Sequence, residues 1–355
     1  MPKFAPPPPV APGTWRVLLQ AAADFAALEP WEFACDNDAV GLIDAITGET
    51  RIGHVLGNAR EVFAAVFYRR VGLRWILAMF SDAPDPEDMN NAEGIDSLQV
   101  EFVPKRELWK EDLAVLNAAG FKPTGKGCVW PRFRSSTPGW HPWYINQAEA
   151  NQLLADLPRL TAFCKMFQKD PDLFGDRPPT EIPFLPATLP DRPLAPQDLD
   201  WRPLLPPPRA GFEPFRLAVD QLDKLRALPR KAGLECEFDC SLIPGASFIE
   251  DGRGCFGRIS LLVETRRGLI LGMELLSGGL APGEATGRGL VRALLQANVL
   301  PEKIFIGGSR FQEVLQPLCD ELEIQLCPVS SLPALDEAAA GLGDFLQARG
   351  ISRSR

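Results

Sequence analysis

Basic and aromatic side chains are interleaved over residues 121–145, a segment that contains no acidic residue. Side chains of these two kinds can stack on nucleic-acid bases or hold a ligand by cation–π contacts. Tryptophans and prolines can also fasten a long loop to a domain core, which is the more common role of aromatic side chains. The sequence leaves both interpretations open. If the segment binds a ligand, the candidate residues are Trp130, Arg132, Arg134, Trp140, His141 and Trp143.

Cysteine and histidine residues offer little for catalysis or metal binding. A nucleophilic cysteine or serine needs a base within reach, and the chain has only His54 and His141. The eight cysteines include no CxxC pair. Cys236 and Cys240 lie on one face of a predicted strand, about 13 Å apart, which is too far for both to bind one zinc ion. We therefore expect no catalytic triad and no metal site, and we interpret these thiols as core residues.

A glycine pattern at residues 252–257 matches G-x-G-x-x-G. A dinucleotide site needs this pattern between a strand and a helix, so that the helix N-terminus meets the pyrophosphate. Here the pattern leads into a predicted strand, and we expect no cofactor.

The composition of the chain bears on which kinds of partner it could bind and on where in the cell it is expected. The net charge is −9, and neither half of the chain is basic, which argues against purely electrostatic binding of nucleic acid. The proline-rich N-terminus has no signal-peptide core, and the apolar runs are too short to span a bilayer. Scattered single thiols fit a reducing compartment. We expect a cytoplasmic protein without a membrane partner, and the sequence leaves a protein or a nucleic acid open as its ligand.

A proline-rich stretch separates two predicted domains. Thirteen prolines lie between Pro171 and Pro214, and proline disfavours both helices and central strands. We therefore predict a domain at residues 1–170, a linker at residues 171–214 and a second domain at residues 215–355.

For the first domain we predict an α+β fold with two strands near residues 40–56, helices at residues 59–68 and 73–80, and a strand at 98–103. A long helix should begin at Asn146, since Glu149 follows as in a capping box.

The second domain shows the clearer pattern. Apolar and polar residues alternate strictly from Leu234 to Leu242, as in a strand with one buried face. Two further strands, at 258–265 and 269–276, precede three helices that alternate with two strands. The predicted order is βββαβαβα, which makes the chain an α/β protein with a mixed C-terminal sheet.

This order resembles the ribonuclease H-like fold, and residues 259–276 are similar to the paired strands of integrase-type and transposase-type domains. The whole chain resembles a bacterial two-domain family of unknown function. The residues behind this resemblance are Trp31-Glu32-Phe33, Trp130-Pro131-Arg132-Phe133-Arg134, Pro138-Gly139-Trp140-His141-Pro142-Trp143 and Leu332-Pro333-Ala334-Leu335-Asp336-Glu337-Ala338. The resemblance covers both domains and brings no activity with it.

If the second domain is a ribonuclease H-like nuclease, its sequence should contain the acidic residues of the active site. Such nucleases gather three or four carboxylates around two divalent metal ions. Asp239 (or Glu237), Glu284 and Asp336 (or Asp344) stand at three of the expected positions, but Gly307-Gly308 follows the fourth strand where an acid is needed. We therefore predict a catalytically degenerate domain in a non-enzymatic binding protein, with a metal-dependent nuclease of atypical acid set as the alternative.

Overall fold

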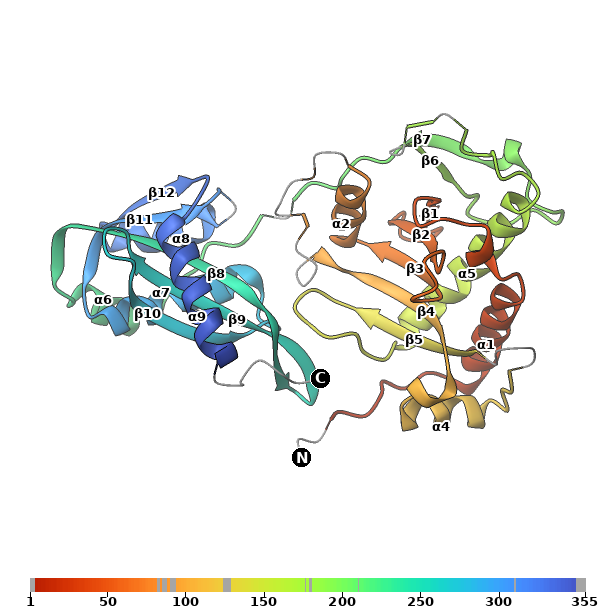
Figure 1. The fold of residues 1–355 in the computed structure, drawn as a ribbon, viewed down its shortest axis with the longest axis horizontal. Helices are drawn as coiled ribbons and strands as arrows, with labels where there is room; N and C mark the ends of the chain where they lie inside the picture. Colours follow the sequence, from red (N-terminus) through yellow and green to blue (C-terminus); the bar gives the residue numbers. More distant parts are fainter. Residues whose placement is uncertain are drawn as a thin grey trace. The chain divides into compact units, whose positions relative to one another are not determined.

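The computed structural model describes residues 4–81, 84, 88–89, 94–123, 129–175, 177–178, 181–209, 211–309 and 311–348. The chain forms two compact units (Figure 1). The N-terminal unit holds residues 5–138 and 142–208, and the C-terminal unit holds residues 209–355 together with Phe4 and residues 139–141. Both units combine helices with a sheet, so the chain is an α/β protein, as the sequence predicts.

The N-terminal unit is built on a seven-stranded sheet with the order β5-β4-β3-β2-β1-β6-β7. Neighbouring strands are antiparallel except for β6, which runs parallel to β1. The strands are β1 (Val40–Ile43), β2 (Thr50–Leu56), β3 (Ala64–Arg69), β4 (Ser97–Val103), β5 (Trp130–Ser136), β6 (Glu181–Phe184) and β7 (Asp200–Pro203).

Strand β3 corrects the helix predicted at residues 59–68. The strand lies between β2 and β4, and all of its residues are buried. Ala65 and Phe67 face one hydrophobic cluster, while Ala64 and Val66 face another. A strand buried on both faces has a continuous apolar run, which periodicity alone does not distinguish from a buried helix.

Helices cover both faces of this sheet. The helices α1 (Pro12–Ala26) and α5 (Gln147–Phe167) pack on one face, and α2 (Gly72–Met79) packs on the other. The predicted capping box opens α5: the Glu149 N–H donates to Asn146 Oδ1, and the Asn146 N–H donates to Glu149 Oε2. A further helix, α4 (Lys110–Ala118), lies between β4 and β5 in the chain.

The predicted linker at residues 171–214 is wrong over most of its length. Residues 181–184 and 200–203 form β6 and β7, and Ile182 and Phe184 are buried. The Phe184 ring lies so close to Gly41 that a Cβ at position 41 would overlap it. Prolines are compatible with these strands, because β7 is at the sheet edge and β6 pairs with β1 through a single register position. Tertiary contacts of the apolar residues between the prolines therefore order a segment whose local sequence favours an extended chain.

The C-terminal unit confirms the predicted order βββαβαβα, preceded by one short helix. Its five strands have the order β10-β9-β8-β11-β12, in which β8, β11 and β12 are parallel and β9 is antiparallel to both of its neighbours. The elements are α6 (Val219–Arg226), β8 (Arg230–Glu250), β9 (Arg253–Glu264), β10 (Leu269–Ser277), α7 (Pro282–Ala297), β11 (Leu300–Gly307), α8 (Gln312–Glu321), β12 (Gln325–Val329) and α9 (Pro333–Ala348).

The predicted alternation of β8 places its apolar side chains on one face of the sheet. Cys236, Phe238 and Cys240 join the cluster beneath α7 and α8, while β9 supplies Leu261 and Val263 to a second cluster beneath α9. No helix in the described part of the chain is long and apolar enough to cross a lipid bilayer.

Candidate functional site

Strand β5 turns the central arginine of the basic and aromatic segment inward. Arg134 is 3% exposed, and its guanidinium donates two hydrogen bonds to Asp112, of 2.8 and 2.7 Å. The same guanidinium lies over the rings of Trp109 and Tyr144, 4.7 and 4.8 Å from their centroids. Both the charge and the flat faces of Arg134 are therefore used within the fold.

The neighbouring candidates also make internal contacts. Arg132 Nε donates to Glu101 Oε2 at 2.6 Å, and Trp143 is buried. Trp130 is half-buried, with the Phe121 ring against its edge and Lys105 Nζ 5.3 Å from its centroid. Of the two interpretations that the sequence leaves open, these contacts favour the structural anchor for Arg132, Arg134 and Trp143.

Trp140 and His141 belong to the C-terminal unit. Trp140 forms an isolated β-bridge with Cys255, and the Arg253 guanidinium lies 5.1 Å from its ring centroid. The His141 ring lies 4.3 Å from that of Phe256, and its Nε2 is 2.9 Å from Ser247 Oγ. Partial burial, and then the charge of Arg253, lower the pKa of His141. These two side chains thus pack against the β8–β9 hairpin.

The acids proposed for nuclease chemistry do not converge. Glu237 Oε2 accepts the Leu335 N–H at 2.7 Å, so β8 presents Glu237, and by alternation Asp239, to the face covered by α9. Asp336 is exposed in the first turn of α9. Glu284 is exposed on α7, on the opposite face of the sheet, where it pairs with Arg288. Across the described residues, no three His, Cys, Asp or Glu side chains are grouped as a metal site.

The thiols and His54 are core groups. Cys236 and Cys240 are buried and free, and burial raises the pKa of Cys236 to about 12. His54 is buried in β2, where its Nδ1 donates to the Asp36 carbonyl at 2.9 Å. A thiol with a raised pKa is poorly ionised and therefore a weak nucleophile.

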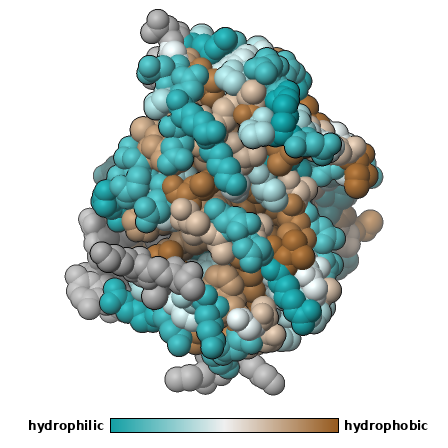
Figure 2. All heavy atoms as spheres, turned by 90° about the vertical axis from the view of Figure 1, so that its right-hand side faces the viewer, coloured by the Kyte–Doolittle hydropathy of each residue, from teal (hydrophilic) through white to brown (hydrophobic). Residues whose placement is uncertain are grey.

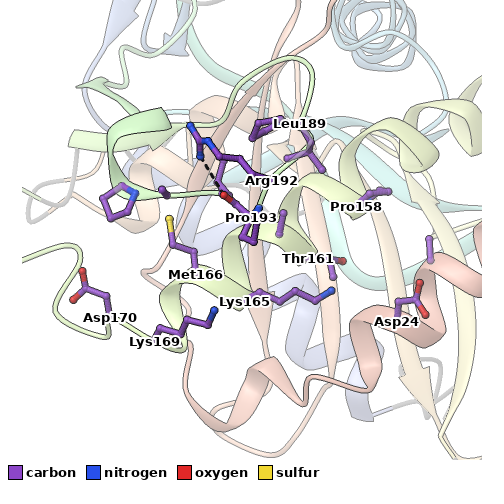
Figure 3. A pocket seen from close by; sticks show the side chains of 16 residues that line it. Asp24, Pro158, Thr161, Lys165, Met166, Lys169, Asp170, Leu189, Arg192 and Pro193 are labelled. Atoms are coloured by element: carbon purple, nitrogen blue, oxygen red, sulfur yellow. Dashed lines mark hydrogen bonds between the residues drawn. The ribbon is translucent and has the colours of Figure 1, made fainter.

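A groove on the N-terminal unit is a feature that the sequence did not indicate. It has a volume of about 560 Å³ and lies between α1, α5 and residues 189–196 (Figure 3). Volumes of a few hundred Å³ are typical of ligand sites. On the side of the molecule drawn in Figure 2, hydrophobic surface is exposed between hydrophilic side chains. The apolar lining of the groove consists of Ala21, Pro158, Ala162, Met166, Leu189, Pro190, Pro193, Leu194, Ala195 and Pro196.

Charged side chains border this groove, and they differ in whether they have partners. Arg192 donates to both carboxylate oxygens of Asp198, at 2.7 and 2.6 Å. Asp24 accepts a hydrogen bond from Gln20. Lys165 in the last turn of α5 and Lys169 just after the helix are exposed and form no ion pair with any described residue (Figure 3). The rim therefore offers two lysines without ion-pair partners beside an apolar floor, together with the carboxylates of Asp24 and Asp170, which form no ion pair with a described residue either.

The sequence does not predict this groove, because residues 189–196, which form its third wall, lie within the predicted linker. Leu194 is 8% exposed, and Arg192 is positioned by Asp198 six residues later. The sequence signal was weak, because the prolines of residues 189–196 are interspersed with Leu189, Leu194 and Ala195 but also with Asp191 and Arg192.

Comparisons with known proteins agree with the two-domain organisation. Residues 15–183 match the family model of a domain of unknown function, DUF7309, and residues 221–343 match that of a domain of unknown function, DUF6930. No curated protein and no solved structure matches the chain. The chain is thus similar to one domain of unknown function over its N-terminal part and to another over its C-terminal part, which is consistent with an uncharacterised two-domain family.

Proposed function

We propose that this chain is a non-enzymatic binding protein of the cytoplasm, and that its ligand is a segment of a protein partner held in the α1–α5 groove. The observation that carries the proposal is the groove of about 560 Å³, which has an apolar floor and lies next to two lysines without ion-pair partners. A cytoplasmic location is supported by the seven described cysteines, all of which are free.

The lining indicates the chemistry of the partner. Apolar side chains on α5 and on residues 189–196 favour an apolar segment, because burying that surface on both sides removes it from water. Lys165 and Lys169 favour an acidic residue at one end of the segment. A short peptide with two or three large apolar residues followed by Asp or Glu satisfies both conditions.

Two observations weigh against the other candidate functions. Arg132 and Arg134, the basic side chains of the candidate binding segment, are paired with Glu101 and Asp112. The acids of the nuclease alternative lie on opposite faces of the C-terminal sheet. The ribonuclease H-like likeness of the C-terminal unit remains part of the proposal, and the strand order β10-β9-β8-β11-β12 supports it.

A display library of random 12-residue peptides, panned against the purified full chain, tests the proposal. We expect enrichment of peptides that place Asp or Glu next to apolar residues. The double variant Lys165→Glu, Lys169→Glu should weaken the enriched peptides at least tenfold by fluorescence anisotropy, because it reverses the rim charge.

The matched control is Lys122→Glu, which reverses an exposed lysine of the same unit outside the groove. It should leave affinity within twofold of the parent chain. If the enriched peptides bind the double variant with the same affinity as the parent chain, the binding surface lies outside the groove. A library that yields no binder would contradict the proposed peptide chemistry.

A further inference from the structure

A second cavity lies within the C-terminal unit, on the face of the sheet that carries α7. It has a volume of about 640 Å³ and is lined by residues of α6, β10, α7 and the segment before α6. One stripe of α7 forms a wall, because Glu284, Arg288, Val291, Arg292 and Leu295 are spaced three or four residues apart. The cavity has the size of a small-molecule site.

Part of the lining is apolar. The side chains are those of Phe215, Leu217, Leu276, Val291 and Leu295. The Phe215 ring lies directly against Gly287 of α7, where a Cβ atom would meet the ring at 2.1 Å. This close approach holds the half-buried ring at the cavity wall. A ligand therefore meets a fixed apolar surface as well as charged groups.

Positive charge is concentrated around the same cavity. Arg216, Lys224, Arg288 and Arg292 line it, against two acids, Glu274 and Glu284. Glu284 is paired with Arg288, and Glu274 accepts a hydrogen bond of 3.3 Å from Gln296. Arg216, Lys224 and Arg292 form no ion pair with another described residue. Three cations without ion-pair partners, from the segment before α6, from α6 and from α7, thus border one cavity in a chain whose net charge is −9.

We propose that this cavity binds a small phosphate ester that carries an apolar or aromatic group. Guanidinium groups match the oxygens of a phosphate through paired, charge-assisted hydrogen bonds, and a lysine adds a further point charge. The apolar wall formed by Phe215 and Leu276 accommodates the organic part of the ligand. A nucleotide and a short-chain phosphatidic acid share this chemistry. This site is independent of the α1–α5 groove, and its test does not depend on the proposed peptide ligand.

Isothermal titration calorimetry on the full chain at 150 mM NaCl tests the proposal with three probes. These are ADP, dihexanoylphosphatidic acid below its micelle concentration, and a 15-residue oligothymidylate. We expect one of the two small esters to bind, and the one that binds identifies the organic group. Arg292→Gln should weaken that probe at least tenfold, because it removes a charged donor to phosphate.

Arg266→Gln is the matched control, since it removes an exposed arginine of the same unit outside the cavity. It should leave affinity within twofold of the parent chain. An equal loss in both variants would show binding by net charge alone and would overturn the proposal. The proposal would also be overturned if the oligothymidylate bound and neither ester did, or if no probe bound at millimolar concentration.

Discussion

Asp112 and Arg134 form a buried ion pair with two hydrogen bonds, and it joins α4 to the central part of β5. Asp112 Oδ2 also accepts the Trp109 N–H, which begins α4. The pair thus connects a helix N-terminus, a strand and the aromatic rings of Trp109 and Tyr144.

Removing one member of this pair should be strongly destabilising. Arg134→Met leaves the Asp112 carboxylate buried without its cation, and a loss of about 3–5 kcal/mol is expected. Urea unfolding followed by tryptophan fluorescence measures it, since seven of the eight tryptophans lie in the N-terminal unit. The double variant Asp112→Asn, Arg134→Met should lose less than the sum of the two single variants. Additive losses would mean that the two residues act independently.

The Trp143 side chain provides a test of the anchor interpretation of residues 121–145. It is buried against the ring of Trp109, with centroids 6.2 Å apart. Trp143→Ala should lower the free energy of unfolding by about 3–5 kcal/mol, because the cavity left in the core is large. Leu205→Ala, at a 75% exposed position, should change it by less than about 0.5 kcal/mol. A loss at Trp143 as small as that at Leu205 would contradict the anchor interpretation.

Fragments of the chain distinguish a linker from an ordered segment. A fragment of residues 1–208 should unfold cooperatively, because it contains all seven strands of the N-terminal sheet. A fragment of residues 1–170 lacks β6 and β7, and it leaves Arg159 without the carbonyls of Leu185 and Pro186 to which it donates. Thermal melts by circular dichroism should show a cooperative transition only for the longer fragment. Equal melting temperatures of the two fragments would show that residues 171–208 add no stability, as expected of a linker.

His54 should make the N-terminal unit less stable in mild acid. Burial lowers the pKa of His54 below the 6.5 of an unperturbed imidazole. As pH falls through 6.5 the unfolded chain takes up a proton that the folded chain does not, so the free energy of unfolding decreases. The decrease can reach about 1.4 kcal/mol per pH unit.

Urea midpoints at pH 7.5 and pH 5.5 measure this effect, and His54→Gln should reduce the difference between them. Asp44, whose pKa is lowered to about 2 by the Thr47 and Ile46 N–H groups, titrates below this window. His141→Gln is the comparison variant, because His141 lies in the C-terminal unit. An unchanged pH dependence in His54→Gln would show that another group takes up the proton.

Particular residues show why some elements could be predicted and others could not. The alternation from Leu234 to Leu242 and the Asn146–Glu149 capping box are local patterns, and both elements form as predicted. Strand β3 has no such pattern, because both of its faces are buried. Residues 181–203 are ordered by partners far away in the chain, as when the Leu185 N–H donates to the Gly41 carbonyl.

The sequence by itself determined the α/β class, the division into two domains and the order βββαβαβα, because periodicity and capping act over a few residues. Tertiary structure decided which charged side chains remain available to a partner. Arg134 is neutralised by Asp112, 22 residues earlier, whereas Lys165 and Arg292 have no such partner among the described residues. Ion pairing depends on which elements pack together in the folded chain. The same holds for the cavities: the groove forms where α5 packs against residues 189–196, and the C-terminal cavity forms where α7 packs near α6 and β10.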